Sequence, residues 1–312
     1  MEHLQLARET SGDDQQWRFI GIWGKNRWEW LATHIANMYF NYTSIGFFDA
    51  MGHSSVDYIV NQTELQTLCA TIDYVAKVCD MKKQGLCKSV KNMVIFDEEN
   101  LNAQHNTMAQ EAQVRLIRFS EVVAAGEGAS HLQFRKCSEN DYPIFSYTSG
   151  TTGDSKGVKL THRNLFQSVY SATELKTTHH DSVLSYLPYP HSFEQFLTFY
   201  TVVYGLKIGF YSGDPLRLME DCQMLKPAFF PSVPRLWNRI YAKISEGIKS
   251  ATGCKGWLAN KALETKLENN IRDGSLTHGC YDFLVFSKMQ KMLGGNIRFL
   301  VTASAPIDKQ VM

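Results

Sequence analysis

The sequence lacks the features that mark several large classes of protein. Its net charge of +1 provides no basic field that would recruit nucleic acid. The seven cysteines are odd in number, scattered and without a C-x-x-C pair, which fits reduced thiols better than a disulfide framework or a zinc site. The longest apolar run, residues 196–206, is too short to cross a bilayer and is typical of a buried helix. An anionic ligand would therefore need a local binding site.

What the chain does contain is a regular alternation of short apolar runs and amphipathic stretches. This rhythm predicts an α/β fold with layered, mostly parallel sheets flanked by helices. Residues 234–293 are expected to be mostly helical, with a break near 253–256, and residues 104–138 to be a surface connection. The expected strands are 17–23, 43–48, 68–72, 93–96, 116–119, 144–147, 183–187, 208–211, 228–233 and 297–302, and the expected helices are 26–42, 54–64, 74–85, 163–176, 192–205 and 215–225.

One segment, S-Y-T-S-G-T-T-G-D-S-K-G-V-K-L-T-H at 146–162, is rich in glycine and hydroxyl side chains and follows an expected strand. Successive small residues allow backbone N–H groups to converge into an anion-binding nest, and Lys156 adds a positive charge suited to a phosphate oxygen. It is not a Walker A loop, because Ser155 stands before Lys156 where that motif has glycine. A flexible hairpin tip is the alternative, since Gly-Asp pairs often mark turns.

The longer pattern F-S-Y-T-S-G-T-T-G-D-S-K-G at 145–157 resembles the AMP-binding signature of the adenylate-forming superfamily. In that family the loop wraps the ATP phosphates while a carboxylate attacks. The pair Asp154-Ser155 replaces the more usual Asn-Pro, which should alter only the stiffness of the loop. The resemblance implies that the ATP contacts are Thr148, Ser149, Gly150, Thr151, Thr152, Gly153 and Lys156.

Four further segments are similar to the long-chain acyl-CoA synthetase branch of this superfamily. They are N-R-W-E-W at 26–30, L-P-Y-P-H-S-F-E-Q at 187–195, V-P-R-L-W-N-R-I-Y at 233–241 and L-G-G-N-I-R-F-L-V-T-A-S-A-P-I at 293–307. The second keeps the His191 and Glu194 of the family pattern but has Gln195 in place of arginine. Other departures are F-D-A-M-G at 48–52 and Ala303, where glycine is common.

The resemblance implies a two-step reaction: a fatty carboxylate attacks ATP to give acyl-adenylate and pyrophosphate, and coenzyme A then displaces AMP. Lys156 and His191 would be the catalytic residues, with His191 at the junction of the acyl and adenylate sites. A histidine that caps the helix beginning at Ser192 is the structural alternative. Ser304, Ala305 and Pro306 would line the adenine and acyl pocket, although Ala-Pro is also an ordinary turn. The aromatic residues between 193 and 200 fit a core better than an acyl tunnel.

The resemblance also implies that residues 1–312 form an incomplete AMP-binding large domain without the small C-terminal domain. The glutamate expected to hold Mg²⁺ would lie beyond the last residue, so no metal ligand is assigned. The expected partners are ATP, coenzyme A and a long-chain fatty acid, with no nucleic acid, and membrane association would come through a missing N-terminal segment. The expected location is the cytoplasm or the cytosolic face of the endoplasmic reticulum or another organelle. The two hypotheses are a long-chain fatty acid–CoA ligase, incomplete as written, and a non-catalytic nucleotide- or acyl-binding remnant.

Overall fold

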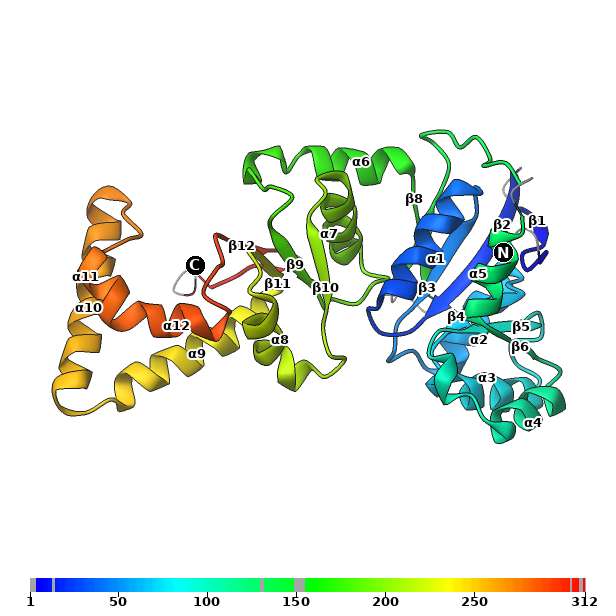
Figure 1. Ribbon diagram of the computed structural model, residues 1–312, viewed down its shortest axis with the longest axis horizontal. Helices are drawn as coiled ribbons and strands as arrows, with labels where there is room; N and C mark the ends of the chain where they lie inside the picture. The colour runs from blue at the N-terminus through cyan, green and yellow to red at the C-terminus, as the bar shows by residue number, and fades with distance from the viewer. Residues whose placement is uncertain are drawn as a thin grey trace. The chain divides into compact units, whose positions relative to one another are not determined.

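The computed structural model describes residues 4–12, 15–129, 132–148, 155–303, 305–308 and 311. The chain divides into two compact units, one of Met1–Ala172 with Tyr186–Phe199 and one of Thr173–Ser185 with Tyr200–Met312. Each unit is built on one β-sheet with helices around it (Figure 1). The expected α/β architecture is therefore confirmed in both.

The first unit contains an eight-stranded sheet in the order β6-β5-β4-β2-β3-β7-β8, with β1 paired to β2. All pairs are parallel except β1 with β2 and β7 with β8. The central strands are buried on both faces, which is why they appear in the sequence as continuous apolar runs. The strands are β1 (Glu9–Gly12), β2 (Gln15–Trp23), β3 (Thr43–Phe47), β4 (Thr67–Ala70), β5 (Asn92–Ile95), β6 (Arg115–Arg118), β7 (Ile144–Thr148) and β8 (Lys156–Leu160).

Alternation along β3 separates the two faces of this sheet. Ile45 and Phe47 belong to the main hydrophobic core, together with apolar residues of α2 and α3. Ser44 and Gly46 point to the opposite face, where Ser44 contacts α1 and Gly46 lies against the segment before α7. The helices that contribute to this unit are α1 (Trp28–Tyr39), α2 (His53–Thr63), α3 (Asp73–Lys83), α4 (Ala103–Glu111), α5 (Phe119–Glu127), α6 (His162–Tyr170) and the first part of α7 (Ser192–Val203).

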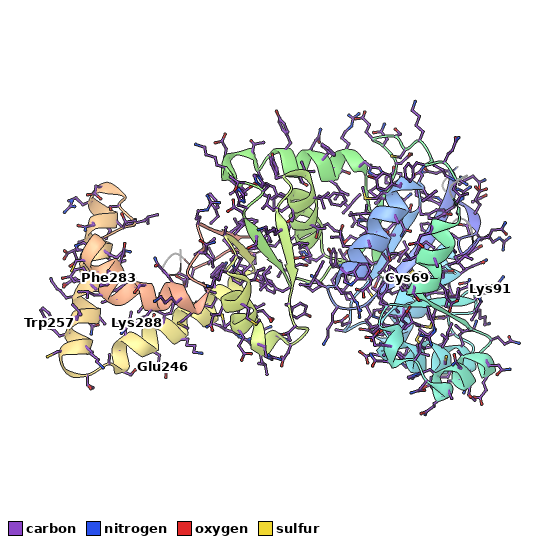
Figure 2. All side chains as sticks on the ribbon, in the orientation of Figure 1. Cys69, Lys91, Glu246, Trp257, Phe283 and Lys288 are labelled. Carbon is purple, nitrogen blue, oxygen red and sulfur yellow. The ribbon has the colours of Figure 1, made fainter. Side chains whose placement is uncertain are left out.

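The second unit contains a four-stranded parallel sheet in the order β10-β9-β11-β12. A long helical segment follows β11, and on it Trp257 and Phe283 are 70% and 78% exposed (Figure 2). No helix in the described parts of the chain is both long and apolar enough to span a membrane. The elements are β9 (Ser182–Ser185), β10 (Lys207–Phe210), β11 (Phe229–Ser232), β12 (Phe299–Thr302), α8 (Leu218–Leu225), α9 (Pro234–Ser250), α10 (Gly253–Asp273), α11 (Gly279–Tyr281), the π-helical η4 (Asp282–Phe286) and α12 (Ser287–Met292).

Most of the expected elements are present, with shifts of a few residues at their ends, but the structure differs from expectation in two places. Strands β1 and β8 were not expected, and β8 falls inside the segment read as one loop from 146 to 162. Residues 104–138 are more than a surface connection, because besides the expected strand, β6, they contain most of α4 and the whole of α5. The expected break between helices is confirmed, because α9 ends at Ser250 and α10 begins at Gly253.

Candidate functional site

The candidate phosphate loop joins β7 to β8, which form an antiparallel hairpin. Thr148 pairs with Lys156 at the end of the ladder next to this loop, and both side chains are exposed. Because β7 is parallel to β3, Thr148 is at a carboxyl edge of the sheet, where α/β proteins commonly bind ligands. The positions between them that are expected to contact ATP, Ser149, Gly150, Thr151, Thr152 and Gly153, lie outside the described residues.

Residues of β7 just before this loop make contacts on both faces of the sheet. The hydroxyl of Tyr147 donates to Gln62 Oε1 at 2.7 Å, and a Cβ added to Gly157 would lie 3.0 Å from the Tyr147 ring. On the opposite face, the hydroxyl of Ser146 donates to the carbonyl oxygen of Pro190 at 2.7 Å. Ser146 and Tyr147 are both buried, which agrees with the strand expected at 144–147.

His191 is half-buried and immediately precedes α7. Its Nδ1 atom accepts a 3.1 Å hydrogen bond from the backbone N–H of Phe193, the contact that a helix-capping residue makes. Burial lowers the pKa of His191, so the ring is favoured in its neutral form. With Nδ1 acting as the acceptor, the proton is on Nε2. The capping alternative is therefore present as a contact, and it leaves Nε2–H available for a second role.

Side chains that the sequence alone does not mark as site residues hold the turn that carries His191. Asn26 Nδ2 donates to the carbonyl oxygen of Leu187 at 2.7 Å and to Glu194 Oε1 at 3.1 Å. Gln195 Nε2 donates to the carbonyl oxygen of Tyr189. Both residues lie in motifs that were recognised from the sequence, but their partners are 161 residues and six residues away, which no local pattern indicates.

Another histidine, His34, is fully buried on the same face of the sheet as this turn. His34 Nδ1 is 2.9 Å from the hydroxyl of Ser44, and Asn37 Nδ2 donates to the same hydroxyl at 3.0 Å. Burial lowers the pKa of His34 to about 3, with a smaller contribution from His162. His34 is therefore neutral at physiological pH.

Ala305 and Pro306 belong to the second unit, where they follow β12 and are exposed, whereas Ser304 lies outside the described residues. The aromatic residues of α7 are largely packed: Phe193 is 8% and Tyr200 1% exposed. The Tyr200 ring lies 6.0 Å from that of Phe229 on β11. This packing agrees with the core interpretation of these side chains.

Among the described residues, no three His, Cys, Asp or Glu side chains gather as they would to hold a metal ion. The described residues therefore form no protein cage for Mg²⁺. An ion that keeps several waters and binds substrate phosphates needs few protein ligands.

Comparison with protein families gives one match over nearly the whole chain. Residues 10–312 match the family described as AMP-binding enzyme. The chain is 34% identical over 295 residues to a peroxisomal long chain acyl-CoA synthetase 6 of Arabidopsis thaliana, covering 94% of this chain and 41% of that protein. It is 32% identical over 316 residues to long-chain-fatty-acid–CoA ligase 1 of Cavia porcellus, covering 99% and 44%. The chain thus spans less than half the length of these relatives.

Solved structures support the fold. The adenylation domain of a carboxylate reductase from Mycobacterium chelonae matches 94% of this chain and 44% of its own, with a TM-score of 0.73 and 16% identity. The N-terminal domain of FACL13 from Mycobacterium tuberculosis matches 94% of this chain and 58% of its own, with a TM-score of 0.59 and 14% identity. At these identities the likeness concerns the architecture alone.

Proposed function

This chain belongs to the AMP-binding enzyme family, and from that premise we propose that it takes part in the ATP-dependent activation of a long-chain fatty acid to acyl-CoA. The observation that carries the proposal is the hairpin of β7 and β8. It presents the signature at a carboxyl edge of the sheet, with Thr148 and Lys156 exposed and opposite each other next to the connecting loop. Similarity to long-chain ligases over 94–99% of the chain supports the choice of fatty acid as substrate.

In this proposal the hairpin binds the phosphates of ATP. Lys156 would place its ammonium on a phosphate oxygen, where a charge-assisted hydrogen bond is stronger than a neutral one. The hydroxyl of Thr148 and the donors of Ser149, Gly150, Thr151, Thr152 and Gly153 would complete the cradle. Charge on the phosphates grows during attack by the carboxylate, so these donors act by positioning and electrostatic stabilisation.

His191 has the properties of a neutral hydrogen-bond donor in this scheme. Its Nδ1 accepts from Phe193, its pKa is lowered by burial, and its Nε2–H can meet a carboxylate or phosphoryl oxygen of the acyl-adenylate. Only the neutral ring can donate from Nε2 while Nδ1 accepts from Phe193, because both nitrogens are donors in the charged form. We assign Ser304, Ala305 and Pro306 to the adenine and acyl pocket on the family pattern that they share.

The remaining assignments rest on the family. Coenzyme A would be the substrate of the second step, in which its thiolate displaces AMP from the adenylate, and Mg²⁺ would be required together with ATP. Residues 1–312 would be part of the large AMP-binding domain, acting in the cytoplasm or at the cytosolic face of an organelle membrane.

The test is fatty-acid-dependent exchange of labelled pyrophosphate into ATP, measured on the purified 312-residue chain with palmitate and Mg²⁺. Exchange that requires palmitate supports the ligase proposal, because only reversible adenylate formation produces it. Calorimetry with AMP on the same sample identifies the other hypothesis. Binding of AMP without exchange would indicate a nucleotide-binding protein that does not catalyse adenylation, and neither exchange nor binding would contradict both.

A further inference from the structure

The turn from Leu187 to His191 has an unusual hydrogen-bonding pattern. All five of its consecutive carbonyl oxygens accept hydrogen bonds. Two of these oxygens accept from backbone N–H groups: Pro188 O accepts from the N–H of His191, and His191 O accepts from the N–H of Gln195. The other three accept from side chains: Leu187 O from Asn26, Tyr189 O from Gln195 and Pro190 O from Ser146.

The three side-chain donors come from three separate places in the chain. Asn26 precedes α1, Ser146 is in β7 and Gln195 is in the first turn of α7. Each is at most 6% exposed. Burying a polar side chain costs free energy unless it is hydrogen-bonded. Because these donors are buried, water cannot replace the carbonyl oxygens that they bind, and each side chain keeps its partner.

Packing fixes the same turn from its two apolar sides. The ring of Tyr189 stacks on that of Trp30, with centroids 4.2 Å apart and 11° between the planes. Pro190 lies so close to β3 that a Cβ added to Gly46 would be 2.9 Å from the Pro190 Cβ. Hydrogen bonds and packing together hold the backbone of residues 187–191 in one conformation.

We propose that Asn26, Ser146 and Gln195 are positioning residues that hold His191 with its Nε2–H presented to the acyl-adenylate. The inference rests on the proposed function and adds residues that the family signature does not assign. Capping of α7 by His191 needs only the contact with Phe193, so helix formation alone does not account for three further donors. Ser146 also lies two positions before Thr148, so it links the His191 turn directly to the strand that presents the phosphate loop.

The decisive measurement is the tautomer of His191, read from the nitrogen chemical shifts of the ring in ¹⁵N-histidine-labelled protein. In the wild type, the two ring nitrogens should be widely separated, with the proton on Nε2. Ser146→Ala removes one donor with the smallest change in volume, and Gln195→Met removes a second at similar size. In both variants we expect the two shifts to move toward each other, and exchange of the hydrogen-bonded amides of His191 and Phe193 to accelerate by about tenfold for one lost hydrogen bond.

Ser89→Ala is the matched control, because its hydroxyl donates to the carbonyl oxygen of Leu65 at 2.7 Å, the same bond made elsewhere in the first unit. It should leave both His191 signals unchanged. Unaltered His191 shifts and exchange rates in Ser146→Ala and in folded Gln195→Met would overturn the positioning role. Adding AMP and palmitate to the wild type tests the proposed function separately: a missing response of the His191 Nε2 signal contradicts that function, whatever the variants show about the turn.

Discussion

The indole of Trp30 stacks on the ring of Tyr189 at 4.2 Å, and this contact joins two sequence motifs that are 159 positions apart by residue number. The N-R-W-E-W motif begins α1, where Arg27 pairs with Glu29, and the L-P-Y-P-H motif forms the turn before α7. Asn26 adds a second link, to Leu187. The first motif therefore serves as a support for the turn that carries His191.

Replacing Lys156 by alanine should weaken ATP use strongly. The substitution removes one charge-assisted contact to phosphate, which is typically ~1.5–3 kcal/mol and corresponds to a loss of about ten- to a hundredfold in kcat/KM for ATP. Palmitate-dependent pyrophosphate exchange measures this directly. Lys88→Ala is the control, since Lys88 is an exposed lysine in the turn before β5. Equal rates for the two variants would remove Lys156 from the site.

For His191, two substitutions separate helix capping from catalysis. His191→Ala removes both the cap and the Nε2–H donor, so it should cost about 1 kcal/mol of stability and also lower kcat/KM for the fatty acid. His191→Asn supplies a new oxygen acceptor for the Phe193 N–H and should restore most of the unfolding midpoint. The exchange rate should remain low in both. Recovery of full activity in His191→Asn would show that the imidazole ring is not required for the reaction, because asparagine provides the cap without it.

Gly46→Ala should disturb the His191 turn from the other side of the contact. The added Cβ would lie 2.9 Å from the Pro190 Cβ, and overpacking of this kind costs about 1–3 kcal/mol. We expect a lower urea midpoint and a fall in fatty-acid-dependent exchange. Gly126→Ala in α5 is the control, because nothing lies within 4 Å of its added Cβ and alanine favours a helix. A Gly46→Ala protein as stable and active as Gly126→Ala would show that the turn can move at no cost.

The sequence predicts the parallel part of the fold well, because buried parallel strands form distinct apolar runs separated by amphipathic helices. The prediction fails for β8, whose residues K-G-V-K-L include only two apolar side chains and lie in a polar, glycine-rich segment, so they form no distinct apolar run. Strand β1, with sequence E-T-S-G, has no apolar signal at all and is defined only by its pairing with β2.

The site is predictable only in part. The glycine- and hydroxyl-rich loop and His191 stand out because their residue types carry chemistry. The donors to the turn do not, since Asn26 and Ser146 are ordinary polar residues whose role depends on contacts with residues 161 and 44 positions away. Local patterns report secondary structure, whereas these contacts arise when the sheet brings α1, β7 and α7 together.

Thiol reactivity provides a test of the core. Cys69, labelled in Figure 2, is fully buried, and burial raises its pKa to about 12. All seven cysteines are free, and only Cys137, Cys254 and Cys280 are exposed. Under native conditions we therefore expect three thiols to react rapidly with a colorimetric disulfide reagent and the full seven only after denaturation. Rapid reaction of a fourth thiol in the native protein would contradict the packing of the sheets.

Stability should fall as the pH is lowered from 7 to 5, with His34 a principal cause. Its folded pKa is about 3, below the ordinary value of about 6.5 in an unfolded chain, because burial disfavours the charged ring. Between these values the unfolded state binds more protons than the native state, so acidification favours unfolding. The expected loss from His34 between pH 7 and pH 5 is about 2 kcal/mol. The His191 and His162 pKa values are also lowered and add losses of the same sign, so the comparison needs a variant that removes His34 alone.

His34→Gln is that variant, since an amide keeps polar atoms near Ser44 but does not titrate in this range. Urea unfolding of both proteins at pH 7 and pH 5 gives the pH dependence of each free energy of unfolding. The substitution itself changes stability by the same amount at both pH values, so that cost cancels in the difference. We expect the wild type to lose about 2 kcal/mol more than His34→Gln over this interval. Parallel losses in the two proteins would mean that His34 is accessible to protons in the native state and that the α1 face of the sheet opens to solvent.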